Sequence, residues 1–150
     1  MSSIDTEVES WLQGLATDLT DPRPGECLRC FVHRMLAEFG CRTTLRFATR
    51  YRDGCAPRAL GLECRLGDRG GFCDCEIFVN GWEVDRRLWA PEVVVEHDGR
   101  TEVVEEADPP ASLPACGGAR RGSTQPCALW RVRRRWSRTM ASASTPDVAP

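Results

Sequence analysis

Two close cysteine pairs constrain the fold of this chain more than any other feature. Cys27 and Cys30 form a Cys-x-x-Cys pair, and Cys73 and Cys75 form a Cys-x-Cys pair, in a chain of 150 residues with 9 cysteines. Thiolates are among the preferred ligands of zinc, and a close pair can direct two sulfurs at one ion. The two pairs therefore predict a metal site that holds a small fold together.

The four paired thiols Cys27, Cys30, Cys73 and Cys75 complete a tetrahedral zinc site without further help. Cys41 offers an alternative. A continuous helix over residues 28–39 would place Cys41 roughly 15–20 Å from the first pair, so one ion cannot reach both ends. We favour the four paired thiols. The rival site combines Cys41, Cys73 and Cys75 with an oxygen, a histidine or water, and would be open to a ligand.

Two other interpretations of the cysteines stay open. The thiols are reduced and lie in or beside a small core, or one of them is a reactive redox group. Cys27 precedes a predicted helix, where a thiol pKa is lowered, but no strand pattern comes before it. The thiols at Cys55, Cys64, Cys116 and Cys127 have no partner at ligand spacing.

Composition predicts a small core and a reducing compartment. Hydrophobic residues make up 41% of the chain, so a metal staple would add useful stability. No apolar run reaches the length of about 18 residues that a membrane span needs, and we expect no membrane partner. The first residues contain neither a basic nor an apolar stretch, so we expect no secretory signal and a cytoplasmic location. Structural disulfides are rare there, which favours metal-bound or free thiols.

Apolar periodicity predicts about four short helices, over residues 4–19, 26–39, 43–51 and 57–66. The second has the clearest pattern, and Gly40 is placed to end it. The fold class that we expect is therefore mainly α.

Short β elements are expected after the helices. Ile77–Val79 has the composition of a short strand. The valine runs Val93–Val95 and Val103–Val104 flank Asp98-Gly99, and Asp-Gly between β-branched runs is a strong hairpin signal. The sequence thus predicts a short strand followed by a hairpin.

Three segments follow from these patterns. Residues 1–87 form a small cysteine-rich helical domain, and residues 88–107 form an acidic β-hairpin extension. Residues 108–150 contain many prolines, then many arginines, and no periodic apolar face. We expect them to be a flexible, disordered tail.

Charge is distributed unevenly although the net charge is −2. Residues 92–108 are acidic and residues 120–138 are basic. The basic block interleaves aromatic and arginine side chains, which can stack on bases and contact phosphates. The side chains predicted to contact nucleic acid in this way are Trp130, Arg131, Arg133, Arg134, Arg135 and Trp136. A solvated tail is the simpler interpretation of the same residues.

Several runs resemble a known bacterial family over about residues 25–82. They are Glu26-Cys27-x-x-Cys30, the run from Phe39 to Arg46, and above all Gly70-Gly71-Phe72-Cys73-Asp74-Cys75-Glu76. The chain is similar here to family 2695 of the domains of unknown function. In that family the cysteine at the position of Cys41 is commonly followed by Asp and often His, where this chain has Arg42 and Thr43. The resemblance implies a fold and a signature, and no reaction.

The sequence favours a non-catalytic, zinc-stabilised module that interacts with a protein partner. The two alternatives are a redox sensor or enzyme that uses the Cys-Asp-Cys thiols, and an accessory nucleic-acid binder. His33 and His97 have no matching nucleophile and carboxylate, and no phosphate loop is present, so an enzyme is the less favoured class.

Overall fold

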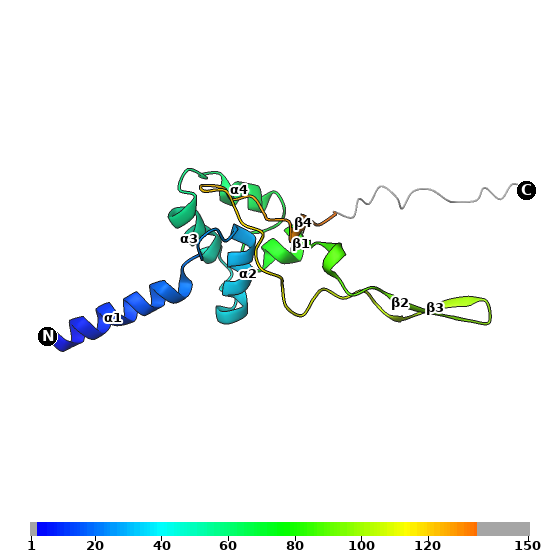
Figure 1. Ribbon diagram of the computed structural model, residues 1–150. Helices are drawn as coiled ribbons and strands as arrows, with labels where there is room; N and C mark the ends of the chain where they lie inside the picture. The colour runs from blue at the N-terminus through cyan, green and yellow to red at the C-terminus, as the bar shows by residue number, and fades with distance from the viewer. Residues whose placement is uncertain (1–2, 135–150) are drawn as a thin grey trace, which may run out of the picture.

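The computed structural model describes residues 3–134, and their helices and strands are arranged around one small core (Figure 1). The helices are α1 (Ser3–Thr20), α2 (Leu28–Phe39), α3 (Arg46–Cys55), α4 (Leu62–Gly67), a π-helix η1 (Ile77–Gly81) and a 3₁₀-helix η2 (Arg86–Leu88). The strands are β1 (Trp82–Val84), β2 (Val93–His97), β3 (Arg100–Glu105) and β4 (Trp130–Val132). More of the described residues are helical than extended, which agrees with the mainly helical prediction only in this coarse sense.

Helix α2 is the centre of the core. Its apolar residues recur at helical spacing, and Leu28, Phe31, Val32 and Met35 are all fully buried. Gly40 follows with φ of 69°, a conformation that glycine adopts without strain, and its N–H bonds to a carbonyl of the last helical turn. The predicted helix is confirmed. Its last residue lies where the pattern placed it, and its first lies two residues later than predicted.

Helices α3 and α4 complete the helical side of the core. Phe47 and Tyr51 of α3 pack against Phe31 of α2, with ring centroids 6.4 and 5.9 Å apart. Leu62 and Leu66 of α4 are buried in the same cluster. The predicted third and fourth helices are therefore present. The third lies three to four residues further along the chain than predicted, and the fourth begins five residues late and ends one residue late.

Helix α1 and the β2–β3 hairpin project from the core on opposite sides (Figure 1). The predicted helix is present, but its apolar side chains are 39% to 67% exposed. The hairpin is also present. Asp98 and Gly99 both have positive φ, as a tight two-residue turn requires, and every residue of its two strands is exposed.

The strand predicted at Ile77–Val79 was wrong. Those residues belong to the π-helix η1, in which the carbonyl of Ile77 accepts from the N–H of Trp82. The carbonyl of Cys75 also accepts from the N–H groups of Phe78 and Val79, which keeps the chain coiled. An apolar run this short fits a strand and a buried helical turn equally well, and local bonding to Cys75 decides it.

The segment after Asp108 also differs from the prediction. Within residues 108–134 it returns along the helical core, and β4 pairs antiparallel with β1 (Figure 1). Cys127 and Trp130 are buried core residues. The flexible tail predicted over 108–150 therefore does not describe this part of the chain. Positions 135–150 lie outside the described residues.

The returning segment is held by bonds that no local pattern reveals. Ala119 N–H donates to the carbonyl of Gly25 over 2.9 Å, and Asp85 N–H donates to that of Leu129 over 2.8 Å. The buried Arg29 guanidinium bonds to the carbonyl of Thr124. Long-range partners compensate here for the weak local preference of a proline-rich segment.

None of the helices within residues 3–134 combines the length and the apolarity that crossing a bilayer requires.

Candidate metal centres

Four thiols from both ends of the described chain meet in one place. The sulfur atoms of Cys27, Cys30, Cys116 and Cys127 all lie within 4.8 Å of one another, and we call this group the four-cysteine cluster. The sulfurs of Cys30 and Cys127 are 3.7 Å apart. A tetrahedral zinc ion with Zn–S bonds of about 2.3 Å separates its sulfurs by about 3.8 Å. The cluster therefore has the ligand set and the size of a four-thiolate zinc site.

The Cys-x-x-Cys pair lies at the start of α2. Cys27 is the residue before the first helical turn, and its sulfur accepts from the N–H of Cys30 over 3.4 Å. The turn from Arg23 to Glu26 leads into it, and the Glu26 carboxylate accepts from the N–H of Arg23 and from the Arg34 guanidinium. The chain thus presents both sulfurs on one side of the helix N-terminus.

N–H groups elsewhere in the chain also donate to the sulfurs of this cluster. Cys116 accepts from the N–H groups of Cys27 and Gly118, each over 3.3 Å. The indole N–H of Trp130 donates to Cys30 over 3.3 Å. Donors of this kind stabilise thiolate charge and orient metal ligands.

Protonation in the cluster favours one thiolate. Hydrogen bonding from the Cys30 thiol lowers the pKa of Cys27 to about 5, although burial opposes this. The same interaction with Cys27, together with burial, raises the pKa of Cys30. Cys27 is fully buried, whereas reactive thiols are partly exposed. Its thiolate is therefore better placed as a ligand than as a nucleophile.

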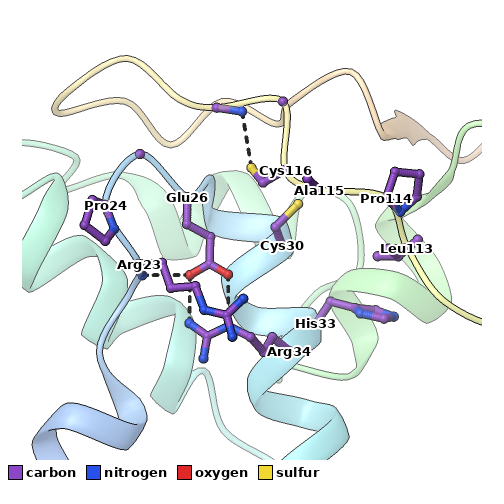
Figure 2. Close-up of a pocket in the computed structure, with 13 residues that line it drawn as sticks. Arg23, Pro24, Glu26, Cys30, His33, Arg34, Leu113, Pro114, Ala115 and Cys116 are labelled. Atoms are coloured by element: carbon purple, nitrogen blue, oxygen red, sulfur yellow. Dashed lines mark hydrogen bonds and ion pairs between the residues drawn. The ribbon is translucent and has the colours of Figure 1, made fainter.

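A cavity of about 570 Å³ borders the four-cysteine cluster. Figure 2 shows Cys30 and Cys116 on one side of it and the ion pair of Glu26 and Arg34 on another. Nε of Arg34 is 3.0 Å from one carboxylate oxygen and Nη2 is 2.8 Å from the other. The two charges neutralise each other. Because Glu26 also accepts from the N–H of Arg23, the ion pair supports the turn before Cys27.

A second group of thiols lies at the other end of α2. The sulfurs of Cys41, Cys73 and Cys75 are within 4.8 Å of one another, and we call them the three-cysteine cluster. Those of Cys73 and Cys75 are 3.2 Å apart. Cys73 is buried, Cys75 is half-buried and Cys41 is exposed. The cluster therefore opens from the core to the surface.

Asp74 anchors the loop that carries two of these thiols. It is fully buried, and its carboxylate oxygens accept from the N–H groups of Phe47 and Ala48 over 3.0 and 3.1 Å. These donors are in the first turn of α3, whose own preceding residue provides no side-chain cap. Asp74 N–H also donates to the carbonyl of Thr44. The central residue of Cys-Asp-Cys is thus a helix cap supplied from a distant loop.

The structure does not bring the two predicted cysteine pairs together. Cys27 and Cys30 meet Cys116 and Cys127, while Cys73 and Cys75 meet Cys41, as in the rival arrangement weighed from the sequence. The reason is the length of α2, which separates the two ends where the clusters form. All nine cysteines lie within residues 3–134, and there each is a free thiol.

Sequence reasoning missed Cys116 and Cys127. Both lie in a proline-rich stretch whose composition indicates a linker, and ten residues separate them. One local signal was available. Gly117-Gly118 follows Cys116 directly, and such a flexible pair lets a backbone N–H turn back onto the sulfur. The pairing with α2 depends on contacts across most of the chain.

The residues predicted to contact nucleic acid have mostly internal partners where they are described. Trp130 is buried against Phe78, with ring centroids 4.9 Å apart. Arg131 and Arg133 both pair with the buried carboxylate of Glu83. Arg134 is the last described residue, and Arg135 and Trp136 lie beyond it. The paired side chains link β4 to β1.

The comparison with protein families identifies one segment. Residues 28–80 match the family described as "Protein of unknown function (DUF2695)". This confirms the resemblance drawn from the glycine and cysteine runs. The whole three-cysteine cluster lies within the matched residues, whereas Cys30 is the only member of the four-cysteine cluster that does. Neither the curated proteins nor the solved structures contained a match to this chain.

Proposed function

We propose that this chain is a non-catalytic interaction module whose fold is stabilised by zinc at the four-cysteine cluster. The observation that carries the proposal is the convergence of Cys27, Cys30, Cys116 and Cys127 within 4.8 Å. Four thiolates with no position left for a substrate are typical of structural zinc sites. The ion would fasten the returning segment to the start of α2.

The returning segment, residues 108–134, needs such a staple. Between Asp108 and β4 it contains no helix or strand, so few backbone bonds of its own hold it. Cys127 of this segment contacts Cys30 of α2 across 97 sequence positions. Closing a loop of this length costs chain entropy, which the free energy of metal binding offsets.

A protein partner is supported by the exposed apolar side of α1. Among its residues Trp11 and Leu12 are 64% and 53% exposed. The helix also carries four acidic residues and no basic one. An apolar stripe bordered by acidic side chains suits a partner surface that is apolar and basic.

The redox alternative rests on a different observation. Cys73 and Cys75 lie 3.2 Å apart near the surface, close enough to interact directly. Formation of a disulfide between them would require an oxidant and would release two protons. The module does not depend on this chemistry, because its staple uses other thiols.

The test is thermal unfolding of full-length protein purified without chelator, measured before and after treatment with EDTA. We expect a large fall in melting temperature that added zinc reverses, because metal binding is coupled to folding. The Cys116→Ser/Cys127→Ser variant should melt at a lower temperature than the wild type without any chelator, because too few thiols remain to hold this ion. Cys64→Ser is the matched control, since Cys64 is exposed and belongs to neither cluster. Wild-type protein that is metal-free as purified and indifferent to EDTA would exclude the proposal.

A further inference from the structure

We propose that Cys41, Cys73 and Cys75 form a second zinc site, with a fourth coordination position that takes a nitrogen ligand from outside the chain. This goes beyond the structural role of the four-cysteine cluster. The two sites lie at opposite ends of α2 and share no residue. An open position is what distinguishes a ligand-binding zinc site from a closed structural one.

The three thiols are held in place before any metal binds. The Asp74 carboxylate accepts two N–H bonds from the first turn of α3, and these bonds fix the loop of Cys73 and Cys75. The Arg46 guanidinium donates to the carbonyls of Phe39 and Gly40 over 3.3 and 3.1 Å, which steadies the chain just before Cys41. Ligands on anchored backbone lose little entropy when an ion binds.

The sulfur geometry fits one soft ion. Sulfurs around a tetrahedral zinc ion lie about 3.8 Å apart. The sulfurs of Cys73 and Cys75 are 3.2 Å apart and that of Cys41 lies within 4.8 Å of both, so a small adjustment of the side chains brings all three to this spacing. The N–H of Thr43 donates to the sulfur of Cys41 over 3.3 Å, and so supports its thiolate form.

No fourth ligand comes from residues 3–134. The group contains three candidate side chains there, and the two carboxylates next to Cys75 in the sequence are already engaged. Asp74 caps α3, and Glu76 accepts from the N–H of Phe72 over 2.9 Å. The exposed Cys41 places the cluster at the surface, so water or an external group can reach the ion.

Charge selects the class of external ligand. Three thiolates and one Zn²⁺ carry a net charge of −1, and the loop of Cys73 and Cys75 also carries the Asp74 carboxylate, so a fourth thiolate would add repulsion. At the four-cysteine cluster the N–H groups of Cys27, Cys30, Gly118 and Trp130 donate to sulfur and offset the charge of a fourth thiolate. A neutral borderline donor such as imidazole adds none and is a preferred zinc ligand. The ligand class is therefore imidazole nitrogen, as in a histidine side chain, in exchange with water.

The experiment loads the full-length protein with cobalt(II) under reducing, anaerobic conditions and titrates it with imidazole. We expect about two bound ions per chain, and a change in the tetrahedral cobalt absorption bands as imidazole replaces water. Cys41→Ser should bind one ion fewer and lose the imidazole response. Cys64→Ser should behave like the wild type. Cys41 is exposed, so its substitution leaves the core intact.

Three results would overturn the inference. Cys41→Ser could bind as many ions as the wild type, or imidazole could leave the wild-type spectrum unchanged. Protein purified anaerobically could also show, by mass, a disulfide between Cys73 and Cys75 in place of two thiols. Cys116→Ser/Cys127→Ser separates this inference from the proposed function, because only two thiols remain at the four-cysteine cluster, so that ion is lost while the imidazole response should persist.

Discussion

At the scale of single residues, the Cys-Asp-Cys motif has two roles, a pair of thiols and a helix cap. The thiols of Cys73 and Cys75 face Cys41, while Asp74 between them turns inward and caps α3. The thiol part could be predicted from spacing. The cap could not, because its N–H partners are 26 and 27 positions away, beyond the reach of any local motif.

The role of Asp74 gives the first prediction. Asp74→Ala should lower the free energy of unfolding by about 2 kcal/mol, because two N–H groups in the first turn of α3 lose a charged acceptor. Urea unfolding measures this. Glu106→Ala is the control, since Glu106 is exposed and should change stability by less than about 0.5 kcal/mol. Equal stability of the two variants would show that Asp74 does not cap α3.

At the scale of elements, the sequence predicted helices well and short strands poorly. Helix α2 spans three turns and repeats its apolar positions often enough to reveal its period. Strands β1 and β4 are three residues each, too short for alternation to show. Their pairing depends on Glu83, a buried carboxylate that bonds Arg131 and Arg133 of the returning segment.

Glu83 gives the second prediction, which depends on pH. Burial raises the pKa of Glu83, but Arg131 and Arg86 together outweigh it, and the pKa in the folded chain lies below its ordinary value. Such a carboxylate stabilises the fold above its unfolded pKa, and the stabilisation is lost as pH falls through the folded pKa. Glu83→Gln should therefore cost about 2 kcal/mol at pH 7, and the cost should shrink as pH falls below about 4.5.

The measurement is urea unfolding of wild type and Glu83→Gln at each pH where the wild type stays folded. Comparison of the two proteins cancels any loss of metal that acid would cause in both. Glu102→Gln, at an exposed position of β3, should match the wild type throughout. A Glu83→Gln variant as stable as wild type at pH 7 would contradict the assigned role.

Helix α1 gives the third prediction. Trp11→Ser should change the free energy of unfolding by less than about 0.5 kcal/mol, because its side chain is 64% exposed. Leu28→Ala in α2 should cost about 2–5 kcal/mol, because it opens a cavity in the core. Thermal unfolding compares the two. If Trp11→Ser costs as much as Leu28→Ala, α1 packs against the core in solution and is not a free docking face.

At the scale of the whole molecule, the packing of the returning segment is the part of the fold that the sequence did not predict. Its prolines and lack of periodicity predict a tail, and each of its anchors lies far away in sequence. Cys127, for example, contacts Cys30 across 97 positions. The sequence predicted that thiols would bind metal but favoured the grouping of Cys27, Cys30, Cys73 and Cys75, which the structure does not form, because only the folded chain determines which thiols meet.

Truncation gives the fourth prediction. A chain ending at Asp108 lacks Cys116, Cys127 and β4, and should fail to unfold cooperatively or to retain zinc at the four-cysteine cluster. A chain ending at Arg134 keeps every described contact and should retain both properties. Circular dichroism with metal analysis distinguishes them. A stable, zinc-loaded chain ending at Asp108 would restore the boundary expected from composition.

The most direct test of the account is zinc content, by native mass spectrometry, of Cys116→Ser/Cys127→Ser beside the wild type, both purified without chelator. The account predicts that the double variant loses the ion of the four-cysteine cluster, since only two thiols of that ligand set remain. If zinc were instead shared by Cys27, Cys30, Cys73 and Cys75, the two substitutions would cost no metal. Wild-type zinc content in the double variant would therefore contradict the central claim.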